Sequence, residues 1–192
     1  MSAPLEVNSQ SFGGVYTLNK GLSDNLDEVL RIQGMGWAKR KIITSATPTL
    51  YIKHFKDSDG REHVQSIQEG PVGLKGNSEE RVLNGERVQQ ESPAFGPVVH
   101  SIRRASIDDI DCGWQKEAWS PDTIENGFII ARLEGDTSKG AKSWITSQVW
   151  GYSVDFPDGN RRHVRKIHVK GHDGEVANCR LVYDYKGPNT KA

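Results

Sequence analysis

The sequence predicts a mostly β protein in which about ten antiparallel strands curl into an up-and-down barrel, with a helix-turn-helix lid near the N-terminus. Three observations support this prediction. Strand-like runs follow one another along most of the chain, each bounded by glycine, proline, asparagine or aspartate. Two adjacent helical patterns occupy residues 23–46. Apolar residues make up only 35% of the 192 residues, which suits a barrel with a partly polar interior better than a solid core.

The composition argues against several classes of function. The 25 Lys and Arg residues balance the 25 Asp and Glu residues, so no net charge attracts nucleic acid or an anionic membrane. No apolar run approaches the ~20 residues of a membrane span, and the first residues lack a signal-peptide pattern, so we expect a cytoplasmic protein. Cys112 and Cys179 are too few for a disulfide framework or a cysteine-rich zinc site, and we expect no metal.

The length and the terminal segments predict the domain organisation. A chain of 192 residues is most simply one domain, present as a monomer or a homodimer. Residues 1–10 are polar and aperiodic, and a Gly-Pro pair begins residues 187–192, so we expect flexible tails at both ends. The barrel domain is therefore expected over residues 11–186.

Two helices are predicted within residues 23–46. Ser23 is a suitable N-cap for the first helix, and Gly34 can supply the left-handed residue that ends it. A second helix lies between Gly36 and Pro48, because proline disfavours helical conformation in the residue before it. The very short connection between the two helices predicts that they pack together as a lid over the barrel mouth.

The remaining patterns predict strands. The runs at 49–55 and 62–69 flank an Asp-Ser-Asp-Gly turn and predict a hairpin. The long acidic connection at 106–126 interrupts the regular alternation, and loops of this length often carry function. The other predicted strands are residues 14–19, 78–84, 86–90, 97–105, 127–134, 144–156, 161–169 and 175–185.

The first third of the chain resembles the intracellular fatty-acid-binding proteins, a family of the calycin group. The resemblance covers about forty residues, in an order of elements typical of this family. It implies the barrel with a helical lid, and a hydrophobic small molecule as partner. The matching positions are Gly14, Tyr16 and Leu18 in the first strand, Ser23, Asn25, Asp27 and Leu30 in the first helix, then Gly34, Gly36, Arg40, Lys41, Ala46 and Pro48.

The last strand resembles the family's closing Val-Tyr-Glu strand, on which an Arg and a Tyr hold a fatty-acid carboxylate. In this chain Tyr183 takes the place of the Tyr, but the Arg position falls on Leu181. Arg180 lies one residue away, and a one-residue offset turns a strand side chain to the opposite face. The resemblance therefore implies a ligand other than a simple fatty acid.

Residues 85–160 match that family only in strand rhythm and are longer. They are similar to small lipocalin-like proteins of filamentous fungi, some of which are cofactor-free cyclases of specialised metabolism, including Diels–Alder-type pericyclases. This second resemblance implies an enzyme that needs no cofactor.

Alternation along the strands predicts which side chains line the barrel interior. For Trp150 and Tyr152 the alternative is packing in the barrel wall. His163 and Arg165 share a face with apolar residues, and the alternative for both is a solvated face; His100, Arg104 and Arg132 have the same ambiguity. The predicted interior positions are Trp144, Gln148, Trp150, Tyr152, Val154 and Phe156 in one strand, and Ala177, Cys179, Leu181, Tyr183 and Tyr185 in the last.

Two functions remain open on the sequence. The first is a cofactor-free cyclase, of Diels–Alder or isomerase type, that folds a hydrophobic polyketide-derived substrate in the pocket. The second is a non-catalytic carrier for a fatty acid or another hydrophobic ligand. Conventional catalytic motifs, such as a Gly-x-Ser-x-Gly elbow or a phosphate-binding loop, are absent. For the cyclase, the candidate catalytic residues are Tyr183, Trp150, Tyr152 and His163, and the candidate ligand-binding residues are Trp144, Gln148, Val154, Phe156, Arg165, Cys179, Leu181, Tyr185, His100 and Arg132.

Overall fold

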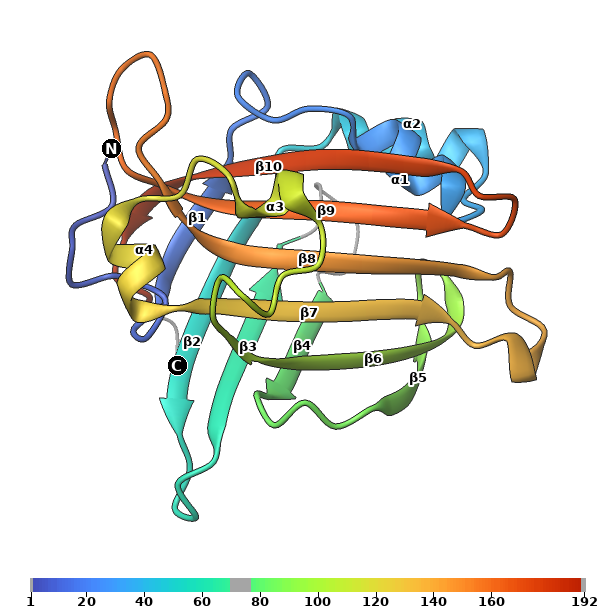
Figure 1. Cartoon of the computed structure of the whole chain (residues 1–192), viewed down its shortest axis with the longest axis horizontal. Coiled ribbons are helices and arrows are strands. Elements are labelled where there is room, and N and C mark those ends of the chain that lie inside the picture. Colours follow the sequence, from blue (N-terminus) through green and yellow to red (C-terminus); the bar gives the residue numbers. More distant parts are fainter. Residues whose placement is uncertain (1, 70–76, 191–192) are drawn as a thin grey trace.

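The computed structural model describes residues 2–69 and 77–190, and in this part of the chain ten antiparallel strands form one curled sheet (Figure 1). Strands that follow one another in sequence pair in space, apart from β4 and β5, and β1 pairs with β10. The predicted mostly β meander is thereby confirmed. The strands are β1 (Gly14–Leu18), β2 (Thr49–Lys56), β3 (Glu62–Gln68), β4 (Asn77–Val82), β5 (Val88–Ser92), β6 (Gly96–Ala105), β7 (Phe128–Gly135), β8 (Trp144–Ser153), β9 (Arg162–Gly171) and β10 (Val176–Gly187).

The curled sheet stays open along one seam. The strands β4 and β5 are the two edges of the sheet, so the barrel is not closed by backbone hydrogen bonds between them. Across this seam, the Arg104 guanidinium on β6 bonds the Glu62 carboxylate on β3. The Gly85 N–H also donates to the Ile102 carbonyl at 2.9 Å. These contacts hold one end of the seam together and leave the rest of β4 and β5 apart.

Helix α1 (Leu26–Ile32) closes one end of the barrel, where Figure 1 shows it with α2 (Trp37–Ser45) beside β9 and β10. Val29 and Ile32 pack on the inward-facing Ile167, Val169 and Cys179. Helix α2 buries no residue and leaves Trp37 67% exposed. The lid is therefore anchored by α1, and α2 covers it from outside.

The ends of α1 differ in part from prediction. Gly34 follows the helix with φ 82, as expected for a glycine that ends a helix in the left-handed conformation. Ser23 is not the N-cap, because the helix begins two residues later, after Asn25. The Ser23 hydroxyl instead accepts the Val182 N–H at 2.9 Å and donates to the Asn19 carbonyl at 2.7 Å, which ties the chain to β10.

Among the described residues, none of the helices has the length and apolar character needed to cross a membrane.

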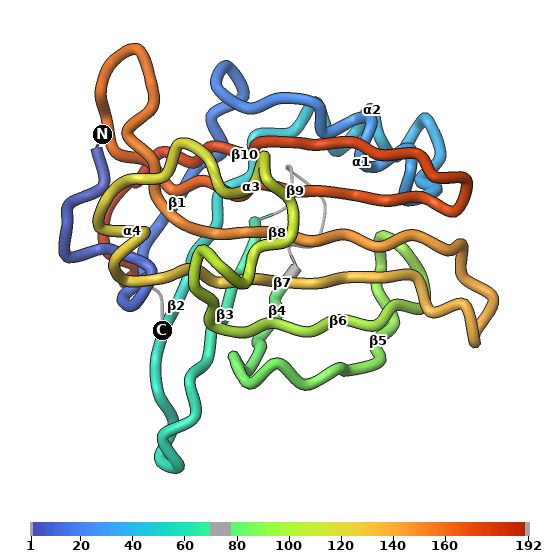
Figure 2. Tube along the Cα trace, viewed as in Figure 1, coloured from blue at the N-terminus to red at the C-terminus, as the bar shows by residue number. Residues whose placement is uncertain are grey.

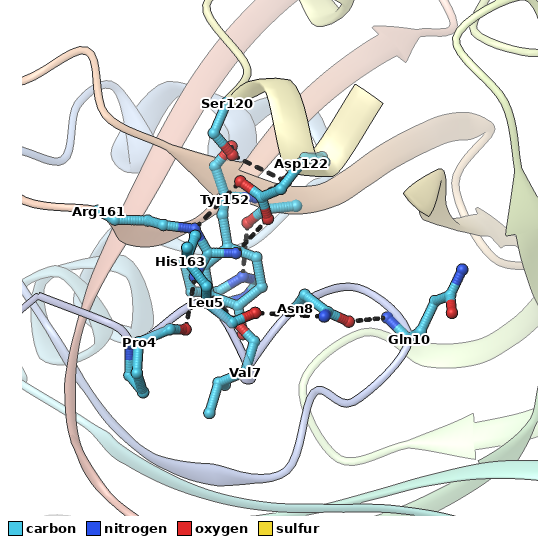
Figure 3. Close-up of polar contacts among 12 residues, drawn as sticks. Pro4, Leu5, Val7, Asn8, Gln10, Ser120, Asp122, Tyr152, Arg161 and His163 are labelled. Carbon is cyan, nitrogen blue, oxygen red and sulfur yellow. Dashed lines mark hydrogen bonds and ion pairs between the residues drawn. The ribbon is translucent and has the colours of Figure 1, made fainter. Parts of the chain in front are cut away.

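Residues 2–10 pack against the barrel, whereas the sequence predicts a flexible tail over residues 1–10. Ala3 and Ser9 are buried. The Arg161 guanidinium donates to the Pro4 carbonyl at 3.1 Å and the Val7 carbonyl at 2.9 Å (Figure 3). The segment thus lies over the end of the barrel opposite α1, a role that its polar, aperiodic sequence does not signal. At the C-terminus β10 extends to Gly187, and residues 191–192 lie outside the described part.

The connection at 106–126 forms a cap on the convex face of the sheet. It contains two short helices, α3 (Gly113–Lys116) and α4 (Pro121–Asn126), and the trace passes across β7, β8 and β9 (Figure 2). Trp119 packs with Phe128, Val149 and Val164 in a cluster separate from the interior one. The expected functional loop at 106–126 therefore covers the outside of the barrel wall.

A separate turn of 3-10 helix, η1 (Thr137–Lys139), joins β7 to β8.

Candidate active site

The concave face of β8, β9 and β10 brings polar and aromatic side chains side by side. Directly opposite residues of antiparallel strands point to the same face. Trp150 is opposite Arg165, and Arg165 is opposite Leu181. Two residues along β9, His163 is opposite both Tyr152 and Tyr183. The alternation in three strands thus produces one continuous patch on the inner wall.

The concave face around Arg165 is incompletely packed. Gln148, Arg165 and Leu181 all lie on the concave face of central strands, yet each is only half-buried. A fully packed interior would bury such side chains completely. The adjoining Trp150 and Tyr183 are buried, with 6% and 5% of their surface exposed. The exposed surface of Gln148, Arg165 and Leu181 therefore lies on the inner wall, next to the buried Trp150 and Tyr183.

In the described part of the chain, the Arg165 guanidinium is held in place by contacts other than a carboxylate. Its Nε donates to His163 Nε2 at 3.1 Å, and its central carbon lies 4.0 Å from the Trp150 ring centroid and 5.3 Å from that of Tyr183. Its Nη2 is buried and has no hydrogen-bond partner among the described residues. Burial lowers the pKa of Arg165, but arginine stays protonated in proteins. A buried cation of this kind needs an accepting group, which a ligand can supply.

His163 orients Arg165 and stays neutral. Its Nδ1 lies 3.0 Å from the Gly151 carbonyl, which can only accept, so the proton is on Nδ1 and Nε2 accepts from Arg165. Burial, and next the charge of Arg165, lower the pKa of His163 well below its usual range. Both ring nitrogens are thus occupied. His163, one of the candidate catalytic residues from the sequence, therefore has no free N–H for a substrate and serves as a positioning residue.

Tyr152 belongs to the closed end of the barrel (Figure 3). Its hydroxyl lies 2.8 Å from the Tyr16 hydroxyl, which in turn donates to the Phe12 carbonyl at 3.0 Å. The Arg161 guanidinium lies 4.0 Å from the centroid of the Tyr152 ring and bonds the Asp122 carboxylate. Burial is the largest cause that raises the pKa values of Tyr152 and Tyr16. Tyr152 therefore has a structural role.

Tyr183 has a hydroxyl that is available to a ligand. It makes no hydrogen bond within the described part of the chain, whereas its ring stacks on His163 with centroids 5.3 Å apart. Burial raises the pKa of Tyr183, and the charge of Arg165 opposes this rise. The hydroxyl is therefore protonated at neutral pH and serves as a donor beside Arg165.

The other predicted interior residues divide between three places. Gln148, Leu181 and Tyr185 lie on the concave face with the patch around Arg165. Trp144 and Cys179 face inward near the α1 end, where Cys179 packs on the helix. His100 faces inward on β6, beside the open seam.

Three predicted ligand-binding residues lie away from the interior. Arg132 is on the convex face of β7 and bonds Glu134. Alternation placed Val154 and Phe156 inside, but β8 ends at Ser153 and the alternation ends with it. Val154 is 44% exposed, and Phe156 packs in the convex-face cluster. These three positions are corrections to the predicted lining.

The sequence reasoning missed several interior residues. Phe12 lies just before the first predicted strand, and its ring centroid is 4.5 Å from that of His163. Glu79 and Arg81 share the concave face of β4, because Arg81 is opposite the buried Val64. The alternation in the run at 78–84 contains the signal for this pair, but the run is too short and too charged to show which face is buried.

The structure also explains the missing Arg of the closing strand. Arg180 points away from the interior, and its backbone N–H donates to the Asp24 side chain at 2.7 Å. Arg165 lies on the neighbouring strand directly opposite Leu181, the position that resembles the family's Arg. The barrel therefore still holds one guanidinium near Tyr183, but it projects from β9 instead of β10.

Comparisons with known proteins agree with this architecture. No family model matches the chain. The chain is 32% identical to a pericyclase of Acremonium sp over 98% of both chains, and 28% identical to a probable pericyclase of Mollisia scopiformis over 97% of this chain and 96% of that one. A fatty-acid-binding protein of Manduca sexta shares the fold, with a TM-score of 0.53 and 17% identity over 90% of this chain and 97% of that one. With a calycin barrel of the fatty-acid-binding type and this degree of likeness over nearly its whole length, the chain belongs to the pericyclase family of cyclases.

Proposed function

We propose that this protein closes a ring in a linear hydrophobic substrate, polyketide-derived, by a Diels–Alder-type cycloaddition inside the barrel. The reaction converts the π bonds of a diene and an alkene into two carbon–carbon σ bonds and one new double bond. No proton, electron or leaving group has to be removed. The chain therefore needs only to fold the substrate and to stabilise the polarised transition state, and both tasks fit the site around Arg165.

The unpartnered Nη2 of Arg165 is the observation on which this proposal depends. An N–H donor next to a carbonyl on the alkene withdraws electron density and favours attack by the diene. Such a donor acts most strongly when it is preorganised and shielded from water. Its hydrogen bond to His163 and its contact with Trp150 fix the guanidinium before the substrate arrives. The Tyr183 hydroxyl is a second donor to the same region.

The shape of the interior supplies the second contribution. A flexible chain that carries diene and alkene must adopt one folded conformer before the bonds form. A pocket that selects this conformer can lower the barrier by up to about 7 to 11 kcal/mol. The flat Trp150 ring and the Leu181 side chain provide apolar surface on either side of Arg165.

The test compares two arginine substitutions. The probe is a synthetic triene ketone, in which a conjugated diene is tethered to an enone, and the rate of ring closure is measured with and without protein. We expect Arg165→Gln to lower the rate constant of the bound substrate about 10²-fold, the magnitude known for loss of one such donor. Arg132→Gln is the matched control, because Arg132 is 48% exposed on the convex face.

The result for the wild type decides the function as a whole. If purified protein leaves the rate and the isomer ratio of ring closure unchanged, the cyclase proposal is wrong. Equal losses in Arg165→Gln and Arg132→Gln would remove Arg165 from the mechanism. Location in the cytoplasm, and a monomeric or homodimeric state, stay predictions alongside this proposal.

A carrier of fatty acids is the second candidate function, and one observation favours it. A carboxylate would satisfy both Arg165 Nη2 and the Tyr183 hydroxyl at once. Displacement of a fluorescent fatty acid measures this binding directly. Submicromolar binding that Arg165→Gln abolishes, without any ring closure by the wild type, would favour the carrier over the cyclase.

A further inference from the structure

A second site lies at the open seam of the barrel. The unpaired edges of β4 and β5 border a cavity of about 370 Å³. It opens to solvent on the outside, and its inner wall belongs to the concave face. The residues used in the following argument are Arg81, His100 and Ile102 on the inner wall, and Glu80 and Glu86 at the rim.

Two nitrogen atoms of this cavity lack a partner. His100 is only 9% exposed, and its Nδ1 is buried without a hydrogen bond among the described residues. The Nε of Arg81 is buried and unpartnered in the same way, although its Nη2 bonds the Glu79 carboxylate at 2.8 Å. Burial, followed by the charge of Arg81, lowers the pKa of His100. The cavity therefore presents a guanidinium N–H and a neutral imidazole to whatever fills it.

Among the described residues of the concave face, Arg165 is an arginine without a carboxylate partner. Glu79 pairs with Arg81, and Glu62 pairs with Arg104 at the closed end. The charge of Arg81 lowers the pKa of Arg165 and that of Glu79 raises it, so the charges of these three groups interact. A ligand that carries one negative charge would balance the positive charge of Arg165.

The acidic residues at the rim do not balance this charge. Glu80 is exposed and lies 3.0 Å from the His63 ring on the outer face, and Glu86 is exposed to solvent. Water and salt screen exposed carboxylates strongly, whereas enclosed charges are screened much less. The deeper wall at Arg81 and His100 therefore determines which hydrogen-bonding groups meet a ligand in the cavity.

We propose that the seam cavity binds a single acidic group of the substrate against Arg81 and His100, while the reacting chain extends inward to Arg165. The acidic group is a carboxylate or the enolate of a 1,3-dicarbonyl, since both present one delocalised negative charge on two oxygens. This inference rests on the proposed function and names its substrate class. Ile102 lines the cavity and also belongs to the interior cluster that contains Trp150, so this side chain links the cavity to the apolar wall of the proposed active site.

The test uses three triene ketones that differ only at the end remote from the reacting atoms. One ends in a carboxylate, one in an enolised 1,3-dicarbonyl and one in a neutral methyl ester. We expect the wild type to have a KM about tenfold or more lower for at least one acidic probe than for the ester, the magnitude expected for hydrogen bonds to a charged group. Which acidic probe is favoured identifies the source of the charge.

The variants locate the preference. Arg81→Gln and His100→Gln should each raise KM for the favoured acidic probe about tenfold and leave both kcat and the ester's KM unchanged. Arg165→Gln should instead lower kcat for all three probes. Arg87→Gln is the matched control, because Arg87 is exposed beside β5 and bonds Glu134 on the outside. Thermal melting of each variant shows whether the fold is kept.

Failure of this inference differs from failure of the proposed function. If the wild type closes the ring in all probes with equal KM, or if Arg81→Gln raises KM for acid and ester alike, the acidic subsite is wrong and the cyclase stands. If no probe reacts, the cyclase is wrong, and calorimetry with the saturated acid and its ester still decides the subsite. Equal affinity for acid and ester, or an acid preference that Arg81→Gln leaves intact, would then overturn it.

Discussion

At the scale of single residues, the site depends on a charged arginine next to a neutral histidine. His163 can accept from Arg165 only while its Nε2 carries no proton. Burial among aromatic rings keeps it unprotonated, since Phe12, Tyr16, Tyr152 and Tyr183 all lie within 6 Å of the ring by centroid distances of 4.5, 5.5, 5.7 and 5.3 Å. The aromatic cluster therefore controls the direction of the Arg165 donors as well as packing the closed end.

This arrangement predicts how stability depends on pH. The pKa of His163 is well below the ordinary value of 6.5, so the unfolded chain binds a proton that the folded protein does not. Stability is therefore complete above about pH 7 and decreases as the pH falls. For one such group the loss between about pH 7.5 and pH 5.5 is about 1.4 kcal/mol. His54 and His100 add to it, because burial lowers their pKa values too.

Urea unfolding of His163→Gln at several pH values measures this contribution. The variant should lose less stability than the wild type over the same pH range, by about 1.4 kcal/mol. His172→Gln, at an exposed position of the β9–β10 turn, serves as the control and should keep the wild-type slope. If His163→Gln and the wild type have the same pH dependence, the histidine is not held neutral by burial.

The sequence predicts much of this site at the residue scale. Alternation places Trp150 and Tyr183 on interior faces, because their strands are long and one face is apolar, but it leaves His163 open between the interior and a solvated face. It cannot show that Arg165 has no carboxylate partner among the described residues, since this depends on which strands the curled sheet brings together. It fails at Phe156, where the strand has already ended and the chain turns to the convex face.

At the scale of elements, the two faces of the central strands have different tasks. The concave face holds the interior site, and the segment with α3 and α4 covers the convex face. Trp119 anchors this cap: it is 7% exposed, its ring contacts Phe128 with centroids 5.3 Å apart, and its Nε1 donates to the Gln115 carbonyl at 2.7 Å. The cap stabilises the wall from the side away from the substrate.

Trp119→Ala should therefore separate stability from activity. Removal of a buried tryptophan costs about 3 to 5 kcal/mol of unfolding free energy, measured by chemical denaturation. The rate of ring closure per folded molecule should stay at the wild-type value, because no atom of the interior changes. Trp37→Ala on the exposed face of α2 should alter stability by less than about 0.5 kcal/mol. A loss of activity in folded Trp119→Ala would show that the cap takes part in catalysis.

The elements also differ in how well the sequence predicts them. The hairpin of β2 and β3 follows from a turn motif between two alternating runs, and Gly34 marks the end of α1 correctly. The N-terminal segment is missed, because its anchor, Arg161, lies more than 150 positions away in sequence. Such long-range side-chain contacts to carbonyl groups leave no periodic signal in the segment that receives them.

At the scale of the whole molecule, the fold is a barrel with two closed ends and one open side. Helix α1 closes one end, the N-terminal segment closes the other, and the seam between β4 and β5 exposes the interior at the side. At the end covered by the N-terminal segment, Arg104, Glu62 and His54 hold the seam together, with His54 Nε2 lying 2.6 Å from the Glu62 carboxylate. The order of strands is predictable from the meander, but the place where the sheet stays open is not.

The central claim is that ring closure takes place in the barrel interior beside Arg165. Leu181→Trp tests it most directly, because this half-buried side chain lies opposite Arg165 and a larger one would fill that space. The added volume should cost no more than about 3 kcal/mol of stability. We expect the rate of ring closure of the triene ketone to fall to the rate without protein, while Val154→Trp, at a position that is 44% exposed, keeps the wild-type rate. A folded Leu181→Trp variant that closes the ring as fast as the wild type would show that the reaction occurs elsewhere.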